Sequence, residues 1–336
     1  MPTRIAVAMA AVLCLPTIAH AAERRLDRAF PITGSGTLNV EADGSNITVT
    51  ATDGTQVVVN VLVKGSQETL DEMILTAEQS AQNVTVTAKR ADGGWRHWFG
   101  SGNLHGEVSV QVPRNYRIDV KTSGGNVVAR GLRGDAIGRT SGGDIKVEDV
   151  QGTVRMKTSG GNMDAARITG STDLNTSGGN IQVRSLTGDL SVKTSGGSIK
   201  LAEITGPVSA RTSSGSVIAT GIKGDADLQT SGGDVRGDKL DGRIRAHTSG
   251  GNVHVTLEGT NRGIDASTSG GDIVVQIAKD TPAYLNAATS GGSVTSEIPV
   301  SVTTSGERKL QGPINGGGEA ILARTSGGNI RIKVRP

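Results

Sequence analysis

The motif Thr-Ser-Gly-Gly, repeated at a fixed spacing, constrains this chain more than any other feature of its sequence. It begins at Thr122 and returns every 18 residues up to Thr248, and further copies begin at Thr268, Thr289 and Thr325. The second glycine is present in every copy, and we expect it to form a structural ladder of turns through Gly125, Gly143, Gly161, Gly179, Gly197, Gly215, Gly233 and Gly251. A fixed period of this kind is typical of repeat architectures, in which each unit stacks on its neighbours.

Each repeat also contains two short segments in which apolar and polar residues alternate. In one copy, Ile145 and Val147 alternate with charged residues, and Val154 and Met156 do the same after a turn at Gly152. Alternation with a period of two predicts a strand that buries one of its faces. The sequence therefore predicts two strands in each repeat, separated by turns that contain glycine.

These features predict an all-β fold, a single-stranded parallel β-helix (β-solenoid) with about 18 residues per coil. Equivalent residues of successive coils would then stack at about 4.8 Å, the spacing of hydrogen-bonded strands. A three-sided hexapeptide helix would need an apolar residue at every sixth position, and the apolar spacing in this chain does not fit that pattern. Because parallel crossover connections are nearly always right-handed, we expect a right-handed coil.

The chain divides into three parts. Residues 116–336 contain the regular repeats and predict the solenoid. Residues 22–115 are less regular, and we expect an N-terminal cap and the first coils there, with a separate domain as the alternative. Within this part, Ser66–Met73 predicts a short helix capped by Ser66. Residues 1–21 combine Arg4, an apolar run and a small-x-small ending, which together predict a secretory signal peptide.

We therefore expect an exported protein that resides in the periplasm, on the cell surface or outside the cell. The only cysteine, Cys14, lies within the predicted signal peptide, so the rest of the chain has no thiol for a disulfide or a zinc site. No later apolar stretch approaches the roughly 20 residues of a membrane-spanning helix. We predict no transmembrane segment once the signal peptide has been removed.

Charge and aromatic content exclude two further classes. The chain has 35 Lys and Arg against 32 Asp and Glu, and these residues are distributed through the repeats. Because no basic patch emerges, we predict no nucleic-acid partner. Aromatic residues make up only 2% of the sequence, which favours a narrow core of Val, Ile, Leu and Ala over a large globular core.

One loop departs from this composition. The segment before Gly106 contains both tryptophans of the chain, and its candidate binding residues are Trp95, Arg96, His97, Trp98 and Phe99. Clustered aromatic rings beside cationic side chains could stack on sugar rings or anchor a protein partner. The structural alternative is that these rings fold over the open flank of the solenoid and plug it.

The sequence predicts no catalytic, metal or cofactor site. The histidines beyond the signal peptide lack the spacing of metal ligands, and they are His97, His105, His247 and His254. Some β-helices cleave polysaccharides with clustered carboxylates, for which the candidates are Glu148/Asp149, Asp225/Asp227 and Asp238/Asp241. We interpret these as solvated turn charges.

The order of these features resembles a known family. A signal peptide, an irregular β region, a Val-Pro-x-Asn turn at Val112 and tandem Thr-Ser-Gly-Gly units resemble the bacterial “putative adhesin” β-strand-repeat family of unknown function. The ending from Gly316 to Ile332 is similar to that of the family. The resemblance implies a parallel β-helix in the cell envelope or outside the cell, and it brings no catalytic motif.

We accordingly predict an exported, non-enzymatic adhesin or envelope module whose partner is a cell-surface glycan or an envelope protein. The alternative is a polysaccharide-binding or glycan-active β-helix protein.

Overall fold

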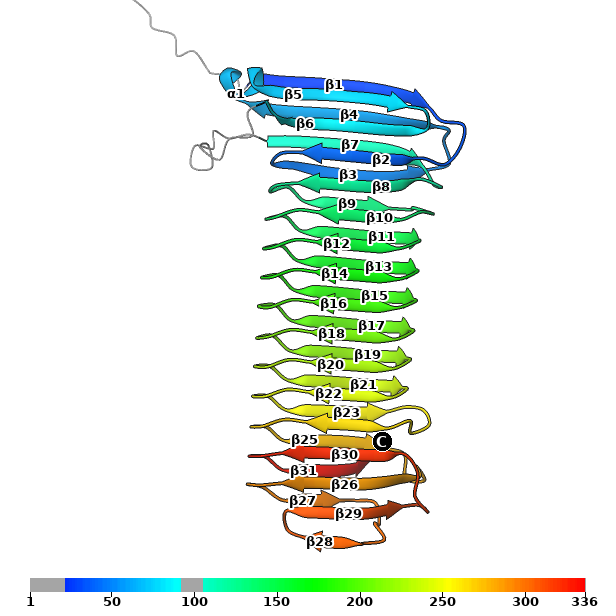
Figure 1. The fold of residues 1–336 in the computed structure, drawn as a ribbon, viewed down its shortest axis with the longest axis vertical. Helices are drawn as coiled ribbons and strands as arrows, with labels where there is room; N and C mark the ends of the chain where they lie inside the picture. Colours follow the sequence, from blue (N-terminus) through cyan, green and yellow to red (C-terminus); the bar gives the residue numbers. More distant parts are fainter. Residues whose placement is uncertain (1–21, 92–104, 336) are drawn as a thin grey trace, which may run out of the picture.

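The fold is a long stack of strands in two facing sheets (Figure 1). A computed structural model describes residues 22–91 and 105–335. Sheet A, as we name the first sheet, has 15 strands and sheet B has 16, and both are mainly parallel. The only helix among the described residues is α1 (Gln67–Asp71), which Ser66 caps as predicted. The all-β prediction is confirmed, whereas the handedness of the coil stays a prediction.

In the regular part of the stack, each repeat gives one strand to each sheet. The strands of sheet A are β9 (Val127–Arg130), β11 (Ile145–Gln151), β13 (Met163–Thr169), β15 (Ile181–Thr187), β17 (Ile199–Thr205), β19 (Val217–Lys223), β21 (Val235–Asp241), β23 (Val253–Leu257) and β25 (Ile273–Ile277). Those of sheet B are β8 (Arg117–Thr122), β10 (Ala136–Arg139), β12 (Val154–Lys157), β14 (Thr172–Asn175), β16 (Leu190–Lys193), β18 (Val208–Arg211), β20 (Ala226–Gln229), β22 (Ile244–His247) and β24 (Ile264–Ser267).

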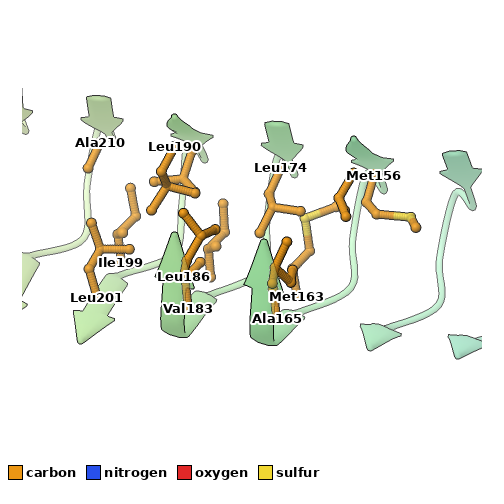
Figure 2. Close-up of a cluster of buried hydrophobic side chains, with 14 of the residues drawn as sticks. Met156, Met163, Ala165, Leu174, Val183, Leu186, Leu190, Ile199, Leu201 and Ala210 are labelled. Carbon is orange, nitrogen blue, oxygen red and sulfur yellow. The ribbon is translucent and has the colours of Figure 1, made fainter. Parts of the chain in front are cut away.

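Strand pairing aligns equivalent residues of successive repeats. Ile145 pairs with Met163, and Met163 pairs in turn with Ile181. Alternate side chains of both sheets point inward, where Leu174 of sheet B and Met163 of sheet A point toward each other between the layers (Figure 2). The core is therefore a narrow aliphatic layer that runs the length of the stack, as the low aromatic content predicts.

In the regular part of sheet A, each longer strand contains one residue whose backbone departs from the extended conformation and turns the chain toward the corner of the coil. Five such residues have positive φ although they are not glycine: Asp149, Arg167, Ser185, Glu203 and Lys239. The pairing skips this position, because Glu148 pairs with Ala166 and Val150 with Ile168. The residue that follows the irregularity returns to the interior, which explains why Val150 and its equivalents are buried.

The Thr-Ser-Gly-Gly turn is held by contacts with the preceding coil. A Cβ atom placed on Gly161 would lie 1.9 Å from the carbonyl oxygen of Gly143, so only glycine fits there. The buried hydroxyl of Thr194 donates a hydrogen bond of 2.8 Å to the carbonyl oxygen of Gly179 and accepts one of 3.3 Å from the amide of Gly197. Each turn thus satisfies buried backbone groups that its own strand cannot reach.

The N-terminal end of the stack is closed by strands that do not follow the chain order. Its strands are β1 (Ala22–Pro31), β2 (Thr37–Ala42), β3 (Ser45–Thr52), β4 (Gln56–Gly65), β5 (Met73–Ser80), β6 (Asn83–Arg90) and β7 (His105–Pro113). Strands β2 and β3 lie between β8 and β9 on one side and β6 and β7 on the other. The antiparallel strands β1, β4 and β5 then complete this end.

The C-terminal end is rearranged in a similar way. Its strands are β26 (Ala283–Thr289), β27 (Val294–Ser296), β28 (Thr304–Gly306), β29 (Lys309–Ile314), β30 (Ala320–Thr325) and β31 (Ile330–Val334). The last coil in sequence, β30 and β31, is inserted between β24–β25 and β26–β27 (Figure 1). Antiparallel strands β28 and β29 form the outer end. The final strands of the chain are therefore paired on both sides.

Asp272 fastens this inserted coil to the regular stack. One of its carboxylate oxygens accepts a 2.7 Å hydrogen bond from the amide of Asn329, and the other accepts a 2.9 Å bond from Arg331. These interactions, led by the bond from the Asn329 amide, lower the pKa of Asp272.

Asp272→Asn is therefore expected to destabilise the protein in a pH-dependent way. A folded-state pKa below the unfolded value stabilises the fold above about pH 4, and this stabilisation is lost as the pH falls through the folded pKa. We expect a loss of up to about 1 kcal/mol at pH 7, because solvent screens the ion pair, and a smaller loss near pH 2.5. Urea unfolding midpoints at both pH values measure it. A deficit that is as large at pH 2.5 would contradict the assignment.

Candidate functional site

The aromatic segment predicted as a binding site lies outside the described residues. Trp95, Arg96, His97, Trp98 and Phe99 all fall within residues 92–104. Their role in binding stays a prediction, and the candidate site must be sought on the surface of the stack.

A groove of about 790 Å³ lies on the outer face of sheet B. It crosses β12, β14, β16, β18, β20, β22 and β24 and ends at β30. At a strand spacing of about 4.8 Å, these eight strands extend over roughly 34 Å. The groove is thus long and shallow, and it runs along the axis of the stack.

The floor of the groove follows one line of outward-pointing residues, which we name the central row. Each member pairs with the next across the sheet. In stack order the row is Ile137, Arg155, Asp173, Ser191, Ser209, Asp227, Arg245, Asp265 and Leu322. The two serines at its centre are short, and Pro207 beside them carries no long side chain. The middle of the groove is therefore hollow, with arginine and aspartate on either side.

Two carboxylates of the central row have partners within the chain. Asp227 accepts hydrogen bonds from Arg211 and, at 2.7 Å, from Gln229. Asp173 accepts one of 2.9 Å from Asn175 through a single oxygen.

Three other charged groups of the row remain available. The side chains of Arg155, Arg245 and Asp265 have no hydrogen-bond or ion-pair partner in the part of the chain that the structure describes. The groove therefore offers charges of both signs, separated by a neutral centre.

A comparison with known protein families shows which family the chain belongs to. Residues 36–226 and 207–333 match the sequence profile of the Toastrack DUF4097 family, so the match extends over most of the chain. The chain belongs to the Toastrack DUF4097 family. No curated protein matches the sequence.

Three solved structures are similar to this Toastrack protein. A “putative cell adhesion protein” from Clostridium sporogenes is 10% identical, with 94% of this chain and 100% of that chain covered and a TM-score of 0.24. “Putative adhesins” from Bacteroides fragilis and Parabacteroides merdae are 14% and 12% identical, each with 93% and 97% coverage and TM-scores of 0.28 and 0.31. These values are too low to support an inference about function, and the family assignment rests on the profile match.

The acidic pairs singled out in the sequence lie on different faces of the Toastrack stack. Asp225 and Asp227 line the groove, where one oxygen of Asp225 accepts a 3.0 Å hydrogen bond from the amide of Arg243. Glu148/Asp149 and Asp238/Asp241 belong to β11 and β21 of sheet A. A hydrogen bond from Arg167 lowers the pKa of Asp149, so this carboxylate is held ionised. Glu148 and Asp238 also form surface ion pairs, with Arg130 and Arg236 respectively.

Sequence reasoning missed the groove itself. Asp225 and Asp227 were recognised only as a local pair, although reading every eighteenth residue from Arg155 collects the central row up to Arg245. Among the described residues, no group of three His, Cys, Asp or Glu side chains is arranged to hold a metal ion. Nor is any described helix long and apolar enough to cross a membrane.

Thr172 lies at the edge of the groove, and its buried hydroxyl has no hydrogen-bond partner among the described residues. Equivalent inward positions of the adjacent strands carry Val154 and Leu190. Thr172→Val keeps the shape and removes the unsatisfied oxygen, so we expect a stabilisation of about 1 kcal/mol. The urea unfolding midpoint measures this change, and Thr172→Ser, which keeps the hydroxyl and loses a methyl group, serves as the control. A lower midpoint for the valine variant would refute the prediction.

Proposed function

We propose that this Toastrack protein is an exported, non-enzymatic binding module of the adhesin type, and that the groove on sheet B is its recognition surface. The protein would act in the periplasm, on the cell surface or outside the cell. The signal-peptide pattern of residues 1–21 and the family resemblance support export. The groove, with unpaired charges of both signs over eight strands, is the observation that carries the binding role.

The shape of the groove favours an elongated partner over a small ligand. It is open along the stack, and its charges lie in rows whose members are roughly 4.8 Å apart. A compact metabolite would contact only two or three strands of such a surface. A glycan chain or a protein surface can contact many of them at once, and weak contacts that are repeated in this way add up to specific binding.

A single bulky substitution tests the groove. Ser191→Trp places a large side chain at its hollow centre, and because Ser191 is exposed we expect the variant to fold normally. Gln182→Trp makes the same change at an outward position of β15 on sheet A and serves as the matched control. We expect binding to a panel of bacterial polysaccharides and intact cells to fall at least tenfold for Ser191→Trp and to be unchanged for Gln182→Trp. Equal binding by both variants would move recognition away from the groove.

The aromatic segment provides a second arm of the same experiment. A Trp95→Ala/Trp98→Ala variant that loses binding while Ser191→Trp retains it would make residues 92–104 the recognition site. Loss in both variants would indicate one partner that contacts both regions.

A glycan-active enzyme is the second candidate, and the carboxylates of the groove favour it. Asp225 and Asp227 are two residues apart and line the same hollow. Asp227, however, is bound by Arg211 and Gln229, which leaves it poorly placed to exchange a proton with a substrate. Release of reducing ends from the polysaccharide panel tests this candidate. Release that Asp225→Asn abolishes would establish the enzyme and overturn the non-enzymatic proposal.

A further inference from the structure

If two copies of the central row lie face to face and run in opposite directions, the charges of one copy complement those of the other. Ser209 is the centre of this arrangement. The residues one strand away from it on either side are Ser191 and Asp227, and those two strands away are Asp173 and Arg245. The next step leads to Arg155 and Asp265. A further step leads to two apolar residues, Ile137 and Leu322, beyond which the sheet continues with Asp119 and Asn286. Each arginine of the central row is thus matched by an aspartate, and Ile137 is matched by Leu322.

From this pattern we propose that the partner of the groove is a second copy of the same chain, packed face to face and antiparallel about a two-fold axis through Ser209. The inference rests on the proposed function, because it names the partner of the same recognition surface. A two-fold axis makes every contact occur twice. The dimer would therefore contain two Arg155–Asp265 pairs and two Asp173–Arg245 pairs across the interface.

The alternative arrangements are electrostatically worse. An axis between Ser191 and Ser209 would place Arg155 opposite Arg245, and it would oppose the aspartates in the same way. In a parallel dimer, the central row would lie against the neighbouring outward row, which contains Lys157. Arg155 would then face Lys157. Like charges directly opposite each other are unfavourable, and of these three arrangements only the axis at Ser209 places each arginine of the row opposite an aspartate.

Outside the central row, this axis brings together both neutral and like-charged pairs. In the neighbouring row, Lys157 would face Ser267 and Lys193 would face Gln229. Arg211 would face its own copy, but each is neutralised by Asp227. The rim carboxylates Asp189 and Asp225 would also face each other, and at the ends of the neighbouring row Arg139 would face Arg324, so both contacts would weaken the complex. The attraction therefore rests on the four Arg–Asp pairs of the central row, and the complex should be weak and sensitive to salt.

The area of the contact agrees with a reversible dimer. Nine strands at about 4.8 Å, each about four residues wide, present roughly 500 Å² per copy, or about 1,000 Å² in total. This value is at the lower limit for specific association, so the dimer should form at high local concentration. Antiparallel packing also suits two chains displayed on facing surfaces, since their stacks would approach from opposite directions. The groove would then mediate adhesion between like proteins.

Charge-swapped variants test the proposal. Asp173→Arg and Arg245→Asp each replace two attractive pairs by two repulsive ones in a homodimer. A mixture of the two variants restores both pairs across the interface. By sedimentation velocity of the exported chain at about 50 mM salt, we expect each variant alone to associate at least tenfold more weakly than wild type. We expect the equimolar mixture to form a heterodimer within about threefold of the wild-type affinity.

Two outcomes would overturn the inference: a wild-type chain that stays monomeric at every accessible concentration, or a mixture that stays monomeric while wild type dimerises. Neither outcome affects the proposed function by itself, since binding to polysaccharides and cells is measured separately with Ser191→Trp and Gln182→Trp. Failure of both variants to fold would show as a lost β-sheet circular dichroism spectrum. In that case, Arg155→Asp and Asp265→Arg apply the same swap to the second pair, with the same expected results.

Discussion

Gly161→Ala is expected to destabilise the stack by about 3–5 kcal/mol. The added Cβ would lie 1.9 Å from the carbonyl oxygen of Gly143 and 2.4 Å from its carbonyl carbon, both of which are backbone atoms. No side-chain rotation can relieve such a contact, so the two coils must move apart. Separation of the coils would also weaken the hydrogen bond that the turn threonine makes with the preceding coil, such as that of Thr176 to Gly161.

The adjacent glycine is a matched control. A Cβ on Gly160 would meet its nearest atom, the carbonyl oxygen of Gly142, at an ordinary 3.7 Å. One repeat already carries a side chain at this position, because Ser214 replaces the first glycine. We therefore expect Gly160→Ala to change the urea unfolding midpoint little, or to raise it by restricting the unfolded chain. Equal effects of the two substitutions would show that stacking distance does not select glycine in the turn.

Deletion of residues 320–336 is expected to unfold the C-terminal end of the stack. Strand β26 pairs along its length with β30, and β27 pairs with β31. Removing β30 and β31 therefore leaves β26–β29 without a parallel neighbour on which to stack. In repeat proteins each unit is stabilised by its neighbours, so the loss should be local.

Hydrogen exchange measures this deletion residue by residue. Amides of β26 and β29 should lose most of their protection, whereas those of β14–β20 should exchange as in the intact protein. The middle strands serve as the internal control, since they lie several coils away from the cut. Retained protection in β26 would mean that the β26–β29 strands fold independently, and it would contradict the role assigned to the inserted coil.

The regular coils were predictable because their interactions are local and periodic. The alternation at Ile145, Val147, Val154 and Met156 identified the inward faces, and all four side chains are buried. The recurring second glycine indicated a turn in every coil, but the contact that requires it is made with the carbonyl group of the coil before, which no single repeat reveals.

The ends and the groove were not predictable in the same way. The order in which coils stack depends on pairing between distant segments, such as Ile264 with Ile321, and the repeat pattern is the same whichever neighbour a coil selects. The groove depends on side chains that point outward, where binary patterning requires only that residues be polar. Ser191 and Ser209 satisfy that rule as well as lysine would. That they leave a hollow in the groove is evident only when the strands are aligned.

The most direct measurement of the central claim locates the bound partner on the protein surface. Carbodiimide labelling modifies exposed carboxylates, and mass spectrometry quantifies it at Asp189 and Asp265 in the groove and at Glu203 on sheet A. We expect labelling of Asp189 and Asp265 to fall several-fold when the chain is bound to cells or to its own copy, and labelling of Glu203 to be unchanged. Unchanged labelling in the groove of a fully bound chain would contradict the claim that sheet B is the recognition face.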